Sequence, residues 1–149
     1  MKNPVTVRIK REELIPGGLL GVEPMVREGA RDGLNAIGLA MLNTAKRKLG
    51  GGGKSGRTYR KYGPSRIHRA SAPGEAPATD TGGLVNSGFH ELDEGALEVE
   101  IGFAKFYAAL LEYGTRMMAP RPFLLPTLEE WRSRISGVIS KAIKARLSK

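Results

Sequence analysis

The sequence predicts an α+β domain: a small antiparallel sheet packed by two long helices, with a long extended loop or arm. Apolar residues recur every three or four positions over 24–49 and again from residue 127, which is the spacing of amphipathic helices. They alternate with polar residues near the start and between residues 88 and 101, as in half-buried strands. The length of 149 residues suits one domain spanning 1–149.

The first strand and the first long helix are expected before residue 50. Val5, Val7 and Ile9 alternate with polar residues, and Pro16-Gly17-Gly18 ends this strand pattern. The helix begins near Pro24, because proline is tolerated in a first turn, where no N–H is needed. Its apolar positions are Val26, Ala30, Leu34, Ile37, Met41, Ala45 and Leu49.

Three glycines interrupt this helix pattern. Gly29, Gly33 and Gly38 each cost about 1 kcal/mol relative to alanine in a helix. Either they allow a neighbouring element to pack closely, or the helix simply tolerates them, and we favour tolerance.

Residues 50–82 are predicted to form an extended arm. They follow no helical or strand period and hold most of the prolines and glycines outside the chain ends. A structureless loop of this length is uncommon in a compact domain unless it is functional or becomes ordered on binding. We therefore expect an arm that is mobile in the free protein.

The net charge of +9 is concentrated in and just before this arm. Residues 46–69 hold nine lysines and arginines and no acid, whereas the rest of the chain carries 15 basic and 15 acidic residues. One segment thus carries the whole excess. Such a concentration indicates an anionic partner, either nucleic acid or an acidic protein surface.

Three short elements are expected in the middle of the chain. Residues 81–87 suit a helical turn capped by Thr81 or Asp80. Residues 88–92 and 97–101 read as two strands joined by a turn. A short helix follows over 105–113 and ends at Gly114.

The last long helix is preceded by a proline-rich entry segment. Residues 121–126 run extended, because each proline keeps the residue before it out of helical geometry, and Phe123 is expected to bury between this helix and the sheet. Thr127-Leu128-Glu129-Glu130 fits a capping box that starts the helix. Its apolar positions are Leu128, Trp131, Ile135, Val138, Ala142 and Ala145.

No catalytic residue, metal ligand or cofactor is predicted, so the sequence does not indicate an enzyme. The two histidines, His68 and His90, lie in different elements, and no cysteine can complete a metal site. His90 is expected to face solvent or a neighbouring subunit. Glu98 and Glu100 share one strand face, which we interpret as a solvated or subunit-facing edge.

Glu112 stands out because an acid in the last turn of a helix opposes the helix dipole. Arg116 and Arg121 follow closely and can offset it. Our hypothesis is an ion pair between subunits. The alternative is a screened surface pair worth at most about 1 kcal/mol.

Three phrases carry a resemblance to a known family. They are SAPGEAP at 71–77 running into TGGLVNS at 81–87, then YAALLEYGT at 107–115, then RPFLLP at 121–126. In this order and spacing they resemble the neck or tail-completion proteins of long-tailed bacteriophages, over roughly residues 25 to 147. The glycine-rich basic stretch 50–69 departs from the family pattern.

The resemblance implies a structural virion protein at the head–tail junction, assembled in the host cytoplasm and without membrane contact. Its partners would be further copies in a hexameric ring, the connector or head-completion protein, and the tail-tube or tail-terminator protein. Genomic DNA would pass through the channel. The candidate residues for the interface between copies are Tyr59, Tyr62, Arg66, Tyr107, Glu112, Arg121 and Phe123.

The alternative is a small cytoplasmic protein that binds nucleic acid without sequence preference through residues 46–69. Lysines and arginines would neutralise phosphates, and Tyr59 and Tyr62 would stack on bases or sugars. The candidates for contact with DNA or an acidic partner are Lys54, Arg57, Arg60, Lys61, Arg66 and Arg69. We favour a structural arm over a dedicated DNA-binding element, and the two roles can coexist.

Overall fold

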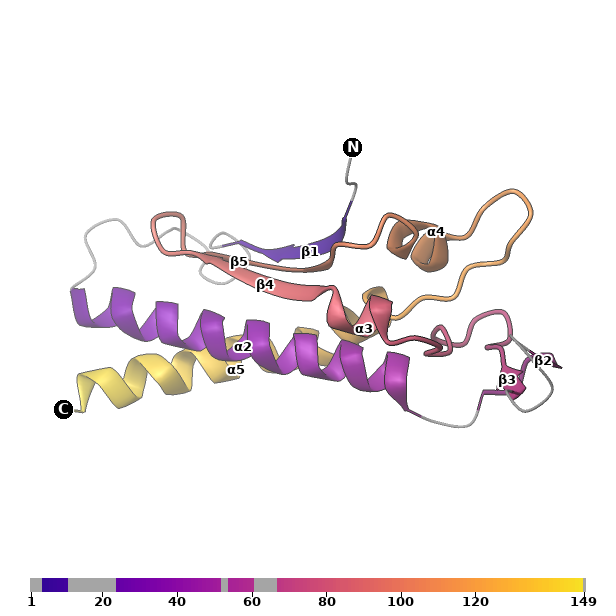
Figure 1. Cartoon of the computed structure of the whole chain (residues 1–149). Helices are drawn as coiled ribbons and strands as arrows, with labels where there is room; N and C mark the ends of the chain where they lie inside the picture. The colour runs from indigo at the N-terminus through magenta and orange to yellow at the C-terminus, as the bar shows by residue number, and fades with distance from the viewer. Residues whose placement is uncertain (1–3, 11–23, 52–53, 61–66, 149) are drawn as a thin grey trace.

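The computed structural model describes residues 4–10, 24–51, 54–60 and 67–148 and confirms the α+β class. The main sheet forms one layer, and the two long helices lie along one of its faces as a second layer (Figure 1). In chain order the elements are β1 (Val5–Ile9), α2 (Pro24–Gly50), β2 (Thr58–Arg60), β3 (Ile67–Arg69), α3 (Gly83–Asn86), β4 (Gly88–Asp93), β5 (Glu98–Phe103), α4 (Ala108–Tyr113) and α5 (Leu125–Leu147).

The main sheet has three antiparallel strands in the order β1-β5-β4. The expected alternation is confirmed, since Leu97, Val99 and Ile101 are buried while Glu98 and Glu100 point to the other face. The turn between β4 and β5 places Leu97 at a φ of 53°. The buried side chains of the sheet meet those of α2 in one hydrophobic core.

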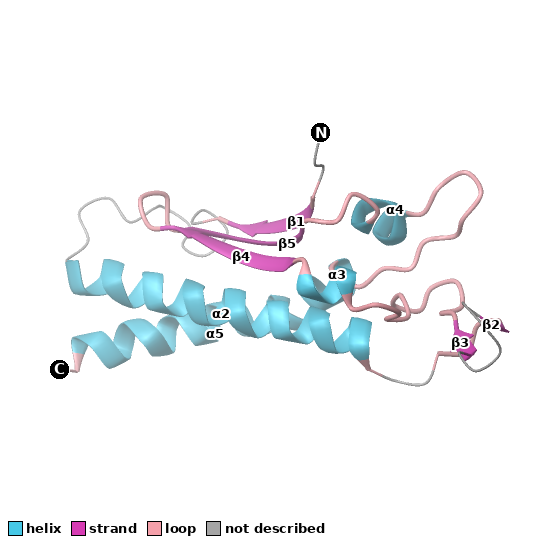
Figure 2. Cartoon of the chain, viewed as in Figure 1, coloured by secondary structure: helices cyan, strands magenta, loops and turns pink. Residues whose placement is uncertain are grey.

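The two long helices run antiparallel and pack on each other under the sheet (Figure 2). Thr44 accepts a hydrogen bond from Trp131 Nε1 at 3.1 Å, and Lys48 pairs with Glu130 at 2.8 Å. At the opposite end of the pair, Arg146 lies 2.6 Å from Asp32. Within the described residues, no helix is long and apolar enough to cross a membrane.

The glycines of α2 are packing positions, so the interpretation as simple tolerance was wrong. A Cβ at Gly29 would lie 2.6 Å from the Cα of Ile143, and one at Gly33 would lie 2.9 Å from the Cα of Ile139. Cβ atoms do not approach backbone so closely. The glycines therefore set how near α5 can come to α2.

Two predicted helix starts are corrected. Helix α5 begins at Leu125, ahead of the expected capping box, and the Thr127 hydroxyl donates back to the carbonyl of Phe123 at 2.7 Å. Thr127 is thus a buried residue inside the first turn. Helix α3 is preceded by Gly82 with a φ of 75°, where glycine is favoured, so the residue in the cap position is Gly82 instead of Thr81 or Asp80.

His90 also lies differently from the prediction. It faces α2, where its Nε2 is 3.0 Å from Oδ1 of Asn35, and its ring carbon Cδ2 would be 3.2 Å from a Cβ at Gly38. Because β4 packs against α2, this histidine is part of the contact between helix and sheet.

The predicted arm contains more regular structure than its sequence indicated. Strands β2 and β3 pair as an antiparallel ribbon that extends beyond the end of α2 (Figure 1). Two backbone hydrogen bonds of 3.0 Å, between Gly56 and Ala70 and between Ala70 and Arg57, continue the pairing. The returning chain is tied to α2 where the Thr79 hydroxyl donates to the carbonyl of Leu49 at 2.7 Å.

Candidate interaction surfaces

The three phrases that carry the family resemblance meet at one end of the molecule. Arg121 donates to the Ser71 hydroxyl at 2.8 Å, across 50 residues of chain. The amide of Gly74 donates to the carbonyl of Pro120 at 3.0 Å. In the described part of the chain, the buried Nε of Arg121 has no hydrogen-bond partner. Arg121 therefore joins the first phrase to the third within one subunit.

Glu112 joins the second phrase to the third. It is 2% exposed, and its carboxylate accepts hydrogen bonds from the amides of Phe123, Leu124 and Leu125 at 2.9, 3.0 and 2.7 Å. These N–H groups lie at the first residue of α5 and just before it, where no preceding helical turn supplies acceptors. The carboxylate thus caps one helix from the last turn of another.

The hypothesis that Glu112 pairs with an arginine of a neighbouring subunit is therefore wrong. Its side chain is enclosed, and its partners are backbone amides of its own chain. Phe123 likewise stays inside the subunit, fully buried and packed edge-on against Phe103 at 5.1 Å between ring centroids. This confirms its predicted burial between α5 and the sheet and removes it from the exposed interface candidates.

The outer face of α4 exposes large apolar side chains. Leu110 and Tyr113 on the helix, with Phe106 just before it, follow at helical spacing and are 46%, 63% and 72% exposed. Met117, in the following turn, is 96% exposed. We call these four residues the α4 apolar face. Because Glu112 fixes the opposite side of the helix to α5, this face is held on a rigid support.

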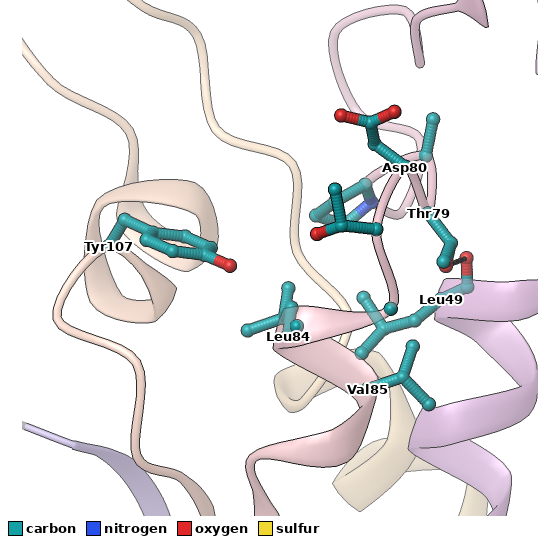
Figure 3. Close-up of a pocket in the computed structure, with 11 residues that line it drawn as sticks. Leu49, Thr79, Asp80, Leu84, Val85 and Tyr107 are labelled. Carbon is teal, nitrogen blue, oxygen red and sulfur yellow. Dashed lines mark hydrogen bonds between the residues drawn. The ribbon is translucent and has the colours of Figure 1, made fainter.

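Tyr107 lies beside a shallow pocket between α4, α3 and the end of α2. Figure 3 shows its hydroxyl pointing across the pocket toward α3, with Leu49 and Thr79 on the other side. The pocket volume is about 180 Å³, and its lining combines Leu84 and Val85 with hydroxyl groups and Asp80. Tyr107 is half-buried here, so only part of its ring is available to another molecule.

The loop at the base of the ribbon is organised by Glu75. Its carboxylate accepts hydrogen bonds from the hydroxyl and amide of Ser55 and from the amide of Ala72. These contacts, led by the Ser55 hydroxyl and supported by the charge of Lys54, lower the pKa of Glu75 from 4.5 to about 2. The ionised carboxylate therefore fixes where the ribbon leaves the domain.

The ribbon exposes one face with alternating basic and apolar character. Thr58, Arg60, Ile67 and Arg69 share this face, since they alternate with Tyr59 and His68 and pair directly across the ribbon. All four are exposed, Ile67 at 66%. We call them the ribbon face.

The remaining candidates of the arm are placed as follows. Arg57 is exposed beside the ribbon face, and Lys54 donates to the carbonyl of Lys48 at 3.1 Å. Tyr59 is 43% exposed and meets His68 edge-on at 5.4 Å between ring centroids. The predictions for Lys61, Tyr62 and Arg66 fall outside the described residues.

The sheet face turned away from the helices carries paired carboxylates. Glu91 lies directly opposite Glu100, and Asp93 lies opposite Glu98. Arg8 lies 2.8 Å from Glu100 and 3.7 Å from Glu98. These four acids and Arg8 line a hollow of about 540 Å³, and we call them the acidic sheet face.

The sequence analysis named Tyr107 and the arginines of the ribbon as candidates but not Leu110, Tyr113 and Met117. A signal was present, because Leu110 and Tyr113 are three residues apart and so lie on one side of the expected helix. Only the placement of Glu112 reveals which side of α4 faces inward.

Comparison of the chain with protein-family models, with curated proteins and with solved structures gives no match. Among the residues that the structure describes, no group of three or more His, Cys, Asp or Glu side chains is arranged to hold a metal ion.

Proposed function

We propose that this protein is a structural subunit of the ring at the head–tail junction of a long-tailed bacteriophage. It joins the connector or head-completion protein to the tail tube or tail terminator, and its own copies assemble side by side. The family assignment rests on the resemblance of the three phrases, and the structure supports a role in assembly.

The observation that carries the proposal is the α4 apolar face on its rigid support. Exposed apolar groups that gather on one face are typical of protein–protein interaction sites, whereas scattered ones are ordinary. Phe106, Leu110 and Tyr113 recur at helical spacing on α4 and just before it, and Met117 is exposed in the turn that follows. Glu112 ties α4 to the start of α5 and so fixes the orientation of this helix. The same phrases thus hold the fold at this end and present the surface.

The mechanism is burial of this face against another protein of the particle. Each large side chain removed from water contributes about 1.5–3 kcal/mol at full burial, before the cost of association. A support that is already ordered lowers this cost, because few side chains and no backbone segment of α4 must be fixed on docking.

The test is electron microscopy of particles made after deletion of the gene from its source phage or prophage. We expect full heads lying apart from tails, or tails of abnormal length, with both defects restored by the wild-type gene supplied in trans. Normal, infectious particles would exclude a role in joining head and tail.

A role in binding nucleic acid has its own supporting observation. The ribbon face exposes Arg60 and Arg69, with Tyr59 part-exposed on the reverse side. A dedicated binder would hold duplex DNA near physiological salt and lose affinity steeply as salt rises. A neck subunit outside its ring would bind duplex DNA weakly, so a salt titration of the purified chain distinguishes the two functions.

A further inference from the structure

The acidic sheet face contains an unfavourable arrangement that the subunit itself does not resolve. Two carboxylate pairs, Glu91 with Glu100 and Asp93 with Glu98, stand directly opposite each other on neighbouring strands. Like charges in directly opposite positions destabilise a sheet. Arg8 pairs with this face, where its single charge lies against Glu100 and Glu98. One arginine cannot neutralise four carboxylates, so this face remains acidic.

The ribbon face has the opposite charge and is also incomplete by itself. It consists of two strands of three residues, and a ribbon of this size is marginally stable in water unless a surface packs against it. On its exposed face, Arg60 lies directly across from Ile67, and Arg69 lies beside Ile67 on the same strand. A partner that fits it must offer carboxylates and enough apolar contact to cover one isoleucine.

The two faces lie toward opposite ends of the molecule. The β4–β5 turn, next to the paired carboxylates, lies near the N-terminal end of α2, and the ribbon extends beyond the C-terminal end of α2 (Figure 1). They therefore do not meet within one subunit. A contact between different patches on two copies is head-to-tail, and such contacts close into rings when the rotation between copies allows it.

We propose that the ribbon face of one copy docks on the acidic sheet face of the next copy. Arg60 and Arg69 would lie over the opposed carboxylates, and Ile67 would pack on the strands between them. The contact relieves the repulsion between Glu91 and Glu100 and orders the ribbon in the same step. This inference rests on the proposed function in one respect, because that function requires copies of the chain to contact one another in a ring. The opposite charges of the two faces do not depend on it.

The test uses charge reversal in the purified full-length chain. We expect self-association, measured by sedimentation, to weaken about tenfold or more in Arg60→Glu/Arg69→Glu and in Glu91→Lys/Asp93→Lys. Combining all four changes in one chain should restore it, and so should mixing the two double variants. Association that survives both reversals, or that the combination does not restore, overturns the proposal. Binding of duplex DNA that depends on Arg60 while sheet reversal has no effect on association would assign the ribbon to nucleic acid.

A second measurement separates docking from folding. Glu91→Lys replaces a repulsive cross-strand pair with an attractive one, so the variant should unfold at the same or a higher temperature than the wild type while associating less well. A residue needed only for the fold would lose stability and association together. Exposed Glu129 on α5 provides the matched control, because Glu129→Lys makes the same change of charge away from both faces.

Cross-linking tests the same contact when association is too weak to measure by sedimentation. The chain has no cysteine, so single cysteines can be introduced cleanly. Copies carrying Arg60→Cys mixed with copies carrying Glu91→Cys should cross-link through a short bismaleimide, whereas Ser133→Cys mixed with Glu91→Cys should not. Absence of the first product at high protein concentration contradicts the proposal. Because these experiments use the isolated chain, they can fail while deletion of the gene still separates heads from tails.

Discussion

Gly29 of α2 lies against the backbone of Ile143 in α5, so closely that a Cβ on the glycine would come within 2.6 Å of the Cα of that isoleucine. Residues 114 positions apart in the chain thus fix the spacing of the two long helices. The contact recurs one turn later, where Gly33 faces Ile139. The helix pair is therefore built on backbone contact as well as on interlocking side chains.

Gly29→Ala should destabilise the protein although alanine is the better helix former. The added methyl group overlaps backbone that cannot move without shifting α5, which costs about 1–3 kcal/mol, beyond the gain in helix propensity of about 1 kcal/mol. Urea unfolding followed by circular dichroism measures the difference. Equal or greater stability in the variant would show that the helices separate at no cost.

Gly137→Ala provides the matched control for that prediction. Gly137 lies inside α5, and apart from the adjacent residues and backbone of its own helix no heavy atom lies within 4 Å of the position a Cβ would take. The same substitution should here stabilise the protein by up to about 1 kcal/mol, because only helix propensity changes. The two substitutions should therefore change the free energy of unfolding in opposite directions.

Glu112→Ala should be among the most destabilising single changes in the chain. It leaves the amides of Phe123, Leu124 and Leu125 without their acceptor, two of them in buried surroundings, at a total cost of about 3 kcal/mol or more. Glu112→Gln keeps one accepting oxygen and should lose about half as much. Thermal unfolding gives the values. Glu129→Gln, in an exposed pair with Arg132, should change stability by less than about 0.5 kcal/mol.

Phe106→Asp/Met117→Asp should prevent assembly and leave the fold intact. Both side chains are mostly exposed, so the free energy of unfolding should change by less than about 1 kcal/mol, whereas a buried interface would then hold two unpaired charges. Complementation of the gene deletion, scored as joined particles, measures assembly. Leu147→Asp is the control, since Leu147 is exposed and close to the C-terminus, which lies at the opposite end of the molecule from α4 (Figure 1). Full complementation by the α4 variant would remove this face from the interface.

Glu75 should titrate well below an ordinary glutamate. Its pKa is lowered from 4.5 to about 2, led by the Ser55 hydroxyl, so its contribution to loop stability is fully present above about pH 4.5 and is lost as the pH falls through about 2. Carbon-detected NMR of the side-chain carboxyl gives the midpoint directly. A midpoint near 4.5 would mean that the contacts with Ser55 and Ala72 do not persist in solution. Ser55→Ala should raise the midpoint because it removes the largest contribution.

The periodic part of the fold could be predicted from sequence. Helix α2 and strands β4 and β5 each bury one face in a shared core, so their apolar spacing reports the geometry directly. Prediction was poorest where a residue acts through a distant partner. Gly29 has the same local sequence signal whether α5 touches it or not, and only the folded pair of helices distinguishes tolerance from close packing.

The candidate site shows the same division. The positive charge of the ribbon could be predicted from composition, because a run of basic residues without acids is a property of the local sequence alone. The role of Glu112 could not, since its carboxylate serves amides that follow it by 11 to 13 residues. The capping-box pattern at Thr127 predicted the start of α5 from the local sequence. The helix instead begins at Leu125, whose amide donates to the carboxylate of Glu112 from α4.

The capping by Glu112 also changes which amide protons of the chain exchange with solvent. The first amides of a helix normally exchange within the fastest group, because no preceding carbonyl accepts them. Here the protons of Phe123 and Leu124 are bonded to a buried carboxylate and become free only when α4 and α5 separate. Deuterium uptake at these positions therefore reports the opening of the end of the molecule where the three phrases meet. Slow uptake there would show that this end unfolds as one cooperative unit.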